Sequence, residues 1–148
     1  MSFNNIKNKF LNTIGRIKPI KKLHVDTYTE EKIKNITGTK IASSNAGEMW
    51  IDFQELNGFL FINANIISHT NLKTNKGARL IIYANDTSYK IESDEHEIKS
   101  EFSNISNTWI TSVSFIINDK ERTLVKFRKF DTIEYLFKKQ CLKFKVFK

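Results

Sequence analysis

Apolar and polar residues alternate along most of this chain, and this period of two predicts a protein built mainly from β-strands. The clearest case surrounds Asn57 and Gly58, which separate the apolar-rich runs MWIDFQEL and FLFINANII. Asn-Gly suits a two-residue type I′ turn, because both central residues take positive φ. Such a turn sets the pairing of the two strands, so that Leu56 faces Phe59 and every pair further along follows from it.

The two faces of this predicted hairpin differ in character. One face is apolar and is expected to enter the core: Met49, Ile51, Phe53, Leu60, Ile62, Ala64 and Ile66. The other combines aromatic rings with amides and a carboxylate: Trp50, Asp52, Gln54, Phe59, Phe61, Asn63 and Asn65. Flat apolar area with a few orienting polar groups suits a ligand surface, so these seven residues are the candidate ligand-binding set. A strand face half covered by a loop or helix has the same composition, and this alternative stays open.

Further strands are predicted from the same alternation in residues 22–29, 78–84, 88–93, 109–117 and 122–130, with a less regular strand in 31–41. The chain ends in LKFKVFK, where lysines alternate with Leu142, Phe144 and Val146. A terminal strand with its lysines toward water is the simplest interpretation, because lysines on an exposed edge prevent edge-to-edge aggregation.

Two segments carry a helical period of three and four instead. Residues 1–18 place apolar side chains on one stripe, namely Phe3, Ile6, Phe10, Ile14 and Ile17. They predict an amphipathic helix that ends before Pro19 and covers an open end or one face of the sheet. Asp131 followed by Glu134 has the character of a capping box and predicts a short helix over about residues 132–140.

The fold class is therefore mainly β, an antiparallel sandwich or curled barrel of about eight strands with an N-terminal amphipathic helix and a short helix near the C-terminus. One domain is expected over residues 1–148, with the helix at 1–18 and the β body at 22–148. No apolar run is long enough to span a bilayer, and a cytoplasmic location is the default expectation.

Charge changes this picture because it is concentrated at the two ends of the chain. The formal net charge is +8, with six Lys or Arg and no acid in residues 1–22, and nine against three acids in residues 121–148. The candidate basic patch consists of Lys126, Arg128, Lys143 and Lys145, on the expectation that the last strand pairs beside residues 124–130. With twenty Lys against four Arg, an AT-rich coding sequence could also produce part of this excess.

Catalytic and metal-binding patterns are absent from the sequence. The histidines at 24, 69 and 96 stand far apart, and the five glycines are dispersed as turn formers. A single cysteine, Cys141, excludes an internal disulfide. We therefore expect no cofactor and no metal, and catalysis is less expected than binding.

The favoured function is a non-catalytic binding module that engages a protein or an anionic surface through its basic terminal segments. The alternative is a carrier of a small apolar ligand, in a cavity lined by Phe residues and the Trp50 face. Nucleic acid is a less favoured partner, because its readers tend to use Arg and the four arginines are scattered. A homodimer is compatible with the sequence.

Overall fold

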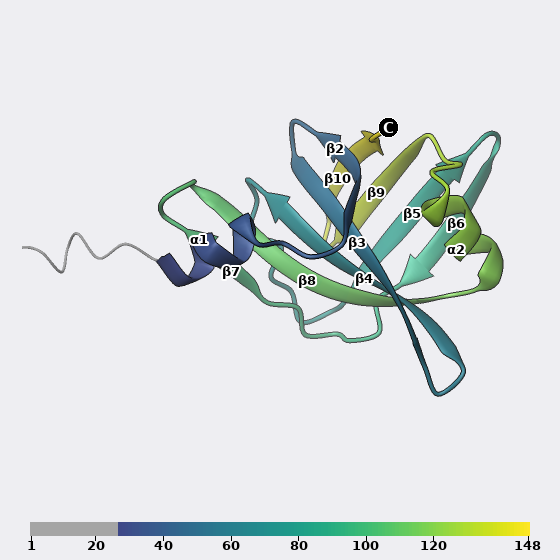
Figure 1. Ribbon diagram of the computed structural model, residues 1–148, viewed down its shortest axis with the longest axis horizontal. Coiled ribbons are helices and arrows are strands. Elements are labelled where there is room, and N and C mark those ends of the chain that lie inside the picture. The colour runs from purple at the N-terminus through teal and green to yellow at the C-terminus, as the bar shows by residue number, and fades with distance from the viewer. Residues whose placement is uncertain (1–26) are drawn as a thin grey trace, which may run out of the picture.

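The computed structural model describes residues 27–148, which form one antiparallel nine-stranded sheet curled into a half-barrel (Figure 1). Across the sheet the strands follow the order β6-β5-β9-β10-β2-β3-β4-β8-β7. The strands are β2 (Thr39–Ser44), β3 (Gly47–Leu56), β4 (Phe59–Ser68), β5 (Ala78–Ala84), β6 (Thr87–Glu92), β7 (Ser100–Ser103), β8 (Thr108–Ile117), β9 (Thr132–Phe137) and β10 (Gln140–Val146). The helices in this part of the chain are α1 (Thr27–Lys34) and α2 (Asp119–Lys126). The predicted fold class is confirmed, as a curled sheet.

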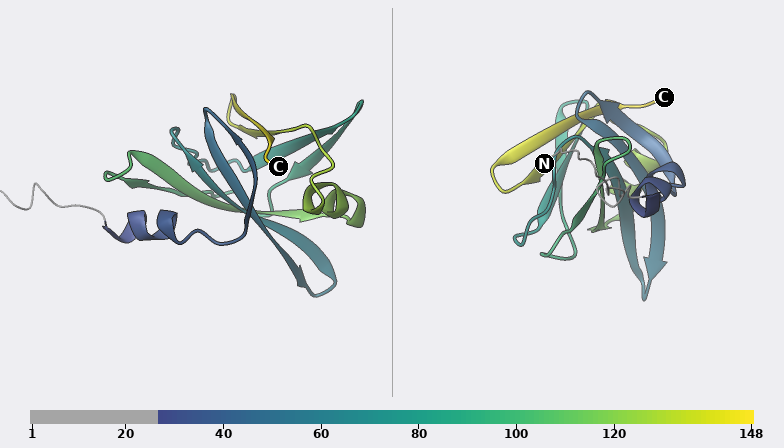
Figure 2. Two further views of the ribbon diagram at one scale, coloured as in Figure 1. Left: turned by 45° about the horizontal axis from the view of Figure 1, so that its top comes forward. Right: turned by 90° about the vertical axis from the view of Figure 1, so that its left-hand side faces the viewer.

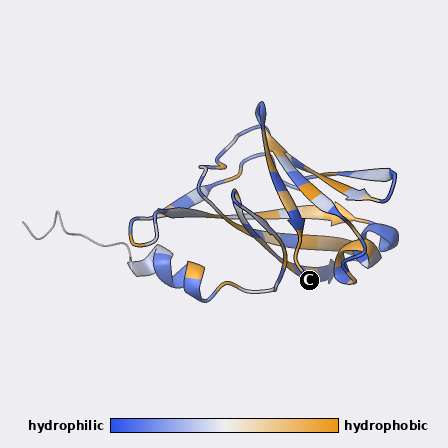
Figure 3. Ribbon diagram, turned by 90° about the horizontal axis from the view of Figure 1, so that it is seen from above, coloured by the Kyte–Doolittle hydropathy of each residue, from blue (hydrophilic) through white to orange (hydrophobic). Residues whose placement is uncertain are grey.

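The β3–β4 hairpin has the predicted turn and register. Asn57 and Gly58 have φ of 54° and 82°, and Leu56 pairs with Phe59. The predicted core face is also confirmed, since five of its residues are at most 2% exposed and Phe53 and Leu60 pack partly buried against them. Hydropathy alternates along the strands in Figure 3, so one face of the sheet encloses the core and the other meets water.

The curled sheet nearly closes on itself at the outer edge of β8. Ser93, just after β6, forms a bridge with Phe115 of β8, and the Asp94 N–H donates to the Ser114 carbonyl at 2.8 Å. Beyond this point the same edge of β8 pairs with β7, a strand that the sequence did not predict. The contact between the segment after β6 and β8 thereby encloses the apolar inner face of the curled sheet. The side chain of Val125, on α2, is fully buried in the same core.

The start of the described chain differs from the prediction. Residues 22–29 and 31–41 were expected as strands, but Thr27–Lys34 form α1 and β2 begins only at Thr39. The side chain of Glu30, in the first turn of α1, accepts hydrogen bonds from Ser103 and Ser106 at 2.6 and 2.8 Å, and these long-range contacts favour the helix over a local strand pattern. The predicted helix over residues 1–18 lies outside the described residues.

The short helix near the C-terminus exists, but the prediction put it in the wrong place. Residues 132–140, predicted as a helix, form β9, the turn and the start of β10, while α2 occupies residues predicted as a strand. A complete capping box joins Asn118 and Glu121 at the start of α2. Burial of the alternating side chains Ile133, Tyr135 and Phe137 outweighs the similar local signal at Asp131. No helix in residues 27–148 is long and apolar enough to cross a membrane.

Tyr135 provides a test of the core. Its side chain is fully buried, burial raises the pKa of its phenol, and its hydroxyl has no hydrogen-bond partner among the described residues. A buried hydroxyl without a partner costs about 1–3 kcal/mol. We therefore expect Tyr135→Phe to raise the free energy of unfolding by about 1 kcal/mol, measured by urea denaturation. Tyr83→Phe is the matched control, because the Tyr83 hydroxyl donates to Glu134 at 3.0 Å and its loss should not stabilise the protein. A less stable Tyr135→Phe protein would contradict the assignment.

Candidate functional site

The last strand, β10, is paired along its whole length on one side and only at its end on the other. Six residue pairs join it to β9, from Gln140 with Phe137 to Lys145 with Thr132. Only two pairs join it to β2, through Lys145 and Val146. LKFKVFK is thus a strand, as predicted. The prediction that this strand pairs beside residues 124–130 was wrong, because α2 extends to Lys126 and the next strand, β9, begins only at Thr132.

The outer face of β10 carries lysines with little compensating negative charge. Lys143 and Lys145 are exposed, while Leu142 and Phe144 between them are buried. Lys143 Nζ lies 3.8 Å from Glu134 Oε2, but this carboxylate also accepts a hydrogen bond from Tyr83. Lys145 forms no ion pair with any residue of the described chain. This face of β10 therefore keeps a net positive charge.

A hollow of about 540 Å³ at the β9–β10 turn continues the positive surface. Six residues line it: Thr74, Asn75, Lys76, Lys138, Lys139 and Gln140. Lys76 reaches the turn because it lies two residues before Ala78, the first residue of β5, which pairs with Phe137 at the end of β9. Three lysines here share the hollow with amides and a hydroxyl, and none of the lining residues is acidic. We call Lys76, Lys138, Lys139, Lys143 and Lys145 the basic strip.

The predicted basic patch is only partly brought together. Lys143 and Lys145 belong to the basic strip, whereas Arg128 lies in the connection between α2 and β9, where its Nη2 donates to the Lys40 carbonyl at 3.1 Å. Lys126 is on α2, and its recorded partner is the ring of Phe127, 5.7 Å away. Within residues 27–148 no hydrogen bond or ion pair joins Lys126 to the strip.

Three lysines of the strip were missed by sequence reasoning. Lys138 and Lys139 fall within residues 132–140, which the sequence predicted as a helix, and Lys76 falls outside every predicted element. The alternation in TIEYLF was the available signal for the first two, because it indicates a strand followed by a tight turn. Lys76 had no local signal, since its position depends on the pairing of β5 with β9.

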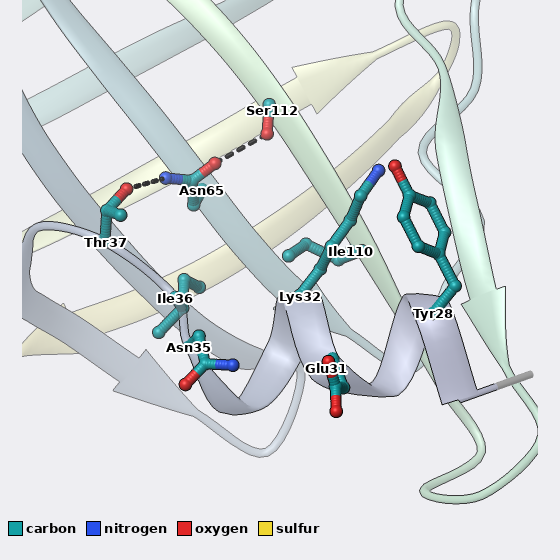
Figure 4. A pocket seen from close by; sticks show the side chains of 9 residues that line it. All are labelled: Tyr28, Glu31, Lys32, Asn35, Ile36, Thr37, Asn65, Ile110 and Ser112. Carbon is teal, nitrogen blue, oxygen red and sulfur yellow. Dashed lines mark hydrogen bonds between the residues drawn. The ribbon is translucent and has the colours of Figure 1, made fainter.

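The candidate ligand-binding set lies together on the outer face of β3 and β4, but it does not surround one cavity. Its polar members are bonded to each other and to neighbouring strands. The Asn63 side chain donates to Gln54 and accepts from Ser114, at 3.0 and 2.7 Å. Asn65 accepts a hydrogen bond from Ser112 and donates to Thr37 (Figure 4). Asp52 lies opposite Asn63 in the hairpin, and it is exposed.

Among the aromatic members of that set, Trp50 is separated from Phe59 and Phe61. Trp50 lines a groove of about 650 Å³ beside α1, together with Ile33, Ile36 and Ile67. Phe59 is 57% exposed at the end of the hairpin that extends beyond the rest of the sheet (Figure 2), with Phe61 two residues further along β4. Trp50 and the buried Phe side chains of the core lie on opposite faces of the sheet.

A second groove, of about 470 Å³, lies along α1 at the outer face of the sheet. Tyr28 and Lys32 line it from the helix, and Asn65, Ile110 and Ser112 line it from the sheet (Figure 4). Lys32 is held by Glu101, with 2.8 Å between Nζ and Oε1, so this cation is already neutralised. The lining of this groove is mixed, and its Asn65 side chain is already bonded to Ser112 and Thr37. Such bonded groups suit the docking of α1 on the sheet as well as they suit ligand binding.

No group of three or more His, Cys, Asp or Glu side chains between residues 27 and 148 is placed to hold a metal ion. Cys141 is exposed, but partial desolvation by its neighbours, with Glu134 close by, raises the pKa of its thiol and disfavours the reactive thiolate. No protein-family model matches the chain, and neither the curated proteins nor the solved structures contain a match.

Glu30, which anchors α1 beside these grooves, makes stability depend on pH. Hydrogen bonds from Ser103 and Ser106 lower its pKa below the ordinary 4.5. A lowered pKa in the folded state means that the stabilisation is present above the unfolded value and is lost as pH falls through the folded value. Glu30→Gln should therefore reduce the loss of stability between about pH 5 and pH 3, measured by urea denaturation. Exposed Glu31→Gln is the control, and equal effects of both substitutions would contradict the anchoring role.

Proposed function

We propose that this protein is a non-catalytic binding module that engages an acidic protein partner through the basic strip. The observation that carries the proposal is the hollow at the β9–β10 turn, where Lys76, Lys138 and Lys139 converge and Lys143 and Lys145 continue along β10. Like charges gathered in a concave surface raise the local positive potential and attract anionic partners. The formal charge of +8 for the whole chain adds to this attraction.

The type of residue in the strip favours carboxylates of a protein over a nucleic acid. Base stacking needs exposed aromatic rings or Arg planes beside the phosphate-binding groups. The outward positions of β9 are Thr132, Glu134 and Leu136, and the outward position of β10 before the lysines is Cys141. They offer no aromatic ring, and the neighbouring ring of Tyr83 on β5 is held by its hydrogen bond to Glu134. Lysine ammonium groups, in contrast, pair readily with flexible Asp and Glu side chains.

Charge neutralisation tests this proposal. Exposed ion pairs contribute about 0.3–0.5 kcal/mol each, so removing four together should weaken binding about tenfold. We expect the variant with Lys138, Lys139, Lys143 and Lys145 all changed to Gln to lose this much affinity for polyglutamate, measured by fluorescence anisotropy. Binding to the unchanged protein should also weaken steeply between about 50 and 500 mM salt.

The matched control changes four exposed lysines outside the strip to Gln: Lys34, Lys90, Lys99 and Lys120. It lowers the net charge by the same amount, so a general electrostatic attraction would weaken equally in both variants. The proposal expects the control to keep nearly all of its affinity. Equal losses would mean that the net charge, and not the strip, binds the anion.

The groove beside Trp50 favours a second candidate function, binding of a small apolar ligand. Its lining combines the indole of Trp50 with Ile33, Ile36 and Ile67, and charged side chains such as Lys34, Lys40 and Glu48 also line it. Apolar area beside a few polar groups suits a small ligand that is mainly apolar and carries a polar group. Native mass spectrometry of the purified protein should then show a small-molecule adduct that Trp50→Ala loses and the strip variant keeps. Absence of any adduct from the unchanged protein would contradict this second function.

A further inference from the structure

We propose that the partner of the basic strip binds as an extended acidic segment, which adds a strand to the open edge of β10. This inference rests on the proposed function and specifies its binding mode. Strand addition combines backbone hydrogen bonds, which supply affinity, with alternate side-chain contacts, which supply specificity. Both kinds of contact are available along β10 between Gln140 and Phe144.

The hairpin geometry shows which backbone groups of β10 are already used. Lys138 and Lys139 form a two-residue turn flanked by Phe137 and Gln140. In such a hairpin the flanking pair exchanges both of its backbone hydrogen bonds, and every second pair does the same. Gln140, Leu142 and Phe144 therefore direct their N–H and C=O groups toward β9.

The odd-numbered residues of β10 direct their backbone groups the opposite way, toward β2. Phe147 shows this direction, because its N–H donates to the Ile41 carbonyl at 2.8 Å. However, β2 pairs with β10 only as far as Lys145, which lies opposite Ser43. Ser44 already pairs with Gly47 in the hairpin to β3, so β2 turns away where β10 continues.

Cys141 and Lys143 are therefore left with unpaired backbone groups at an open edge. Within residues 27–148, no strand pairs with the N–H and C=O groups that they direct away from β9. Cys141 is exposed, which keeps the edge accessible. The open stretch from Gln140 to Phe144 is about 17 Å long, enough for a partner strand of four or five residues.

The lysines determine which strand fits this edge. A second copy of β10 in antiparallel pairing would bring lysines close to one another, and like charges on facing strands are destabilising. A segment with Asp or Glu at alternate positions instead places a carboxylate directly opposite Lys143, on the outer face of the sheet. Its intervening residues would lie on the side of Leu142 and Phe144, which favours apolar side chains there. Lys138, Lys139 and Lys76 would attract further acids at the end of the segment.

This register makes a sharp prediction about the peptide backbone. In antiparallel pairing, the residue opposite Lys143 exchanges hydrogen bonds with it, and that residue is the acidic one. A suitable probe is a fluorescein-labelled peptide with four Val-Glu repeats, titrated with the full-length protein at low salt. N-methylation of its Glu residues should weaken binding at least about tenfold, whereas N-methylation of its Val residues should leave binding nearly unchanged.

A protein variant tests the same edge from the other side. Cys141→Pro removes one N–H from the open edge but none from the ladder with β9, and proline is tolerated where the N–H of an edge strand is free. Cys141→Ser keeps the N–H and is the matched control. We expect Cys141→Pro to weaken binding of the parent peptide about tenfold and Cys141→Ser to leave it unchanged. Should Cys141→Pro fail to fold, the two methylated peptides still decide the question.

The outcomes separate this inference from the proposed function. If both methylated peptides bind as well as the parent, the strip recognises charge alone, so strand addition is wrong and the proposed function stands. Binding of polyglutamate without binding of the Val-Glu peptide leads to the same conclusion. If neither polyglutamate nor the peptide binds, both proposals fail. Protein that dimerises through Cys141 and Lys143 would show that a second copy occupies the edge and would overturn the inference.

Discussion

The structure depends on burying one apolar face from each of several strands in a single sheet. A flat sheet would leave that face in water, and there is no second sheet in residues 27–148 to cover it. The sheet therefore curls until Ser93, beyond β6, meets Phe115 of β8. Curling brings the largest side chains of distant strands together, among them Met49, Phe115 and Phe144, all of which are fully buried.

The same constraint determines what remains outside. Every buried residue on a strand leaves its neighbours on the outer face, so lysines, amides and hydroxyls gather there by alternation. On β3, β4 and β8 these polar groups bond to one another and lie partly beside α1. On β10 they are mainly lysines, with Glu134 as the nearby acid. β2 pairs with β10 over only two residue pairs before it turns into the hairpin to β3, and this turn leaves the edge of β10 open.

The sequence predicted the structure correctly where a local turn determines how two consecutive strands pair. Asn57 and Gly58 specify a turn, the turn specifies the register, and the register separates the core face from the outer face of β3 and β4. It failed where two similar local signals competed. Asn118 with Glu121 and Asp131 with Glu134 both resemble capping boxes, and only the first begins a helix. Long-range burial of Ile133 and Tyr135 decides between them, and this burial cannot be read from spacing.

The candidate site was predictable to the same limited extent. Alternation in LKFKVFK correctly placed Lys143 and Lys145 on an exposed strand face, because their position depends only on the period of the strand. The half-open pairing of β10 depends on where β2 ends, and the position of Lys76 depends on the β5–β9 pairing. Both are non-local properties. The outer face of β3 and β4 looked like one ligand surface, although Trp50 and Asn65 lie in grooves beside α1 and Phe59 is exposed at the far end of the hairpin.

The most direct test of this account is amide hydrogen exchange in β10 of the unliganded protein, measured residue by residue by NMR. The open edge predicts an alternating pattern, in which the amides of Leu142 and Phe144 are protected by β9 while those of Cys141 and Lys143 exchange rapidly. Strong protection of all four amides would show that another strand already occupies this edge, and would contradict the account.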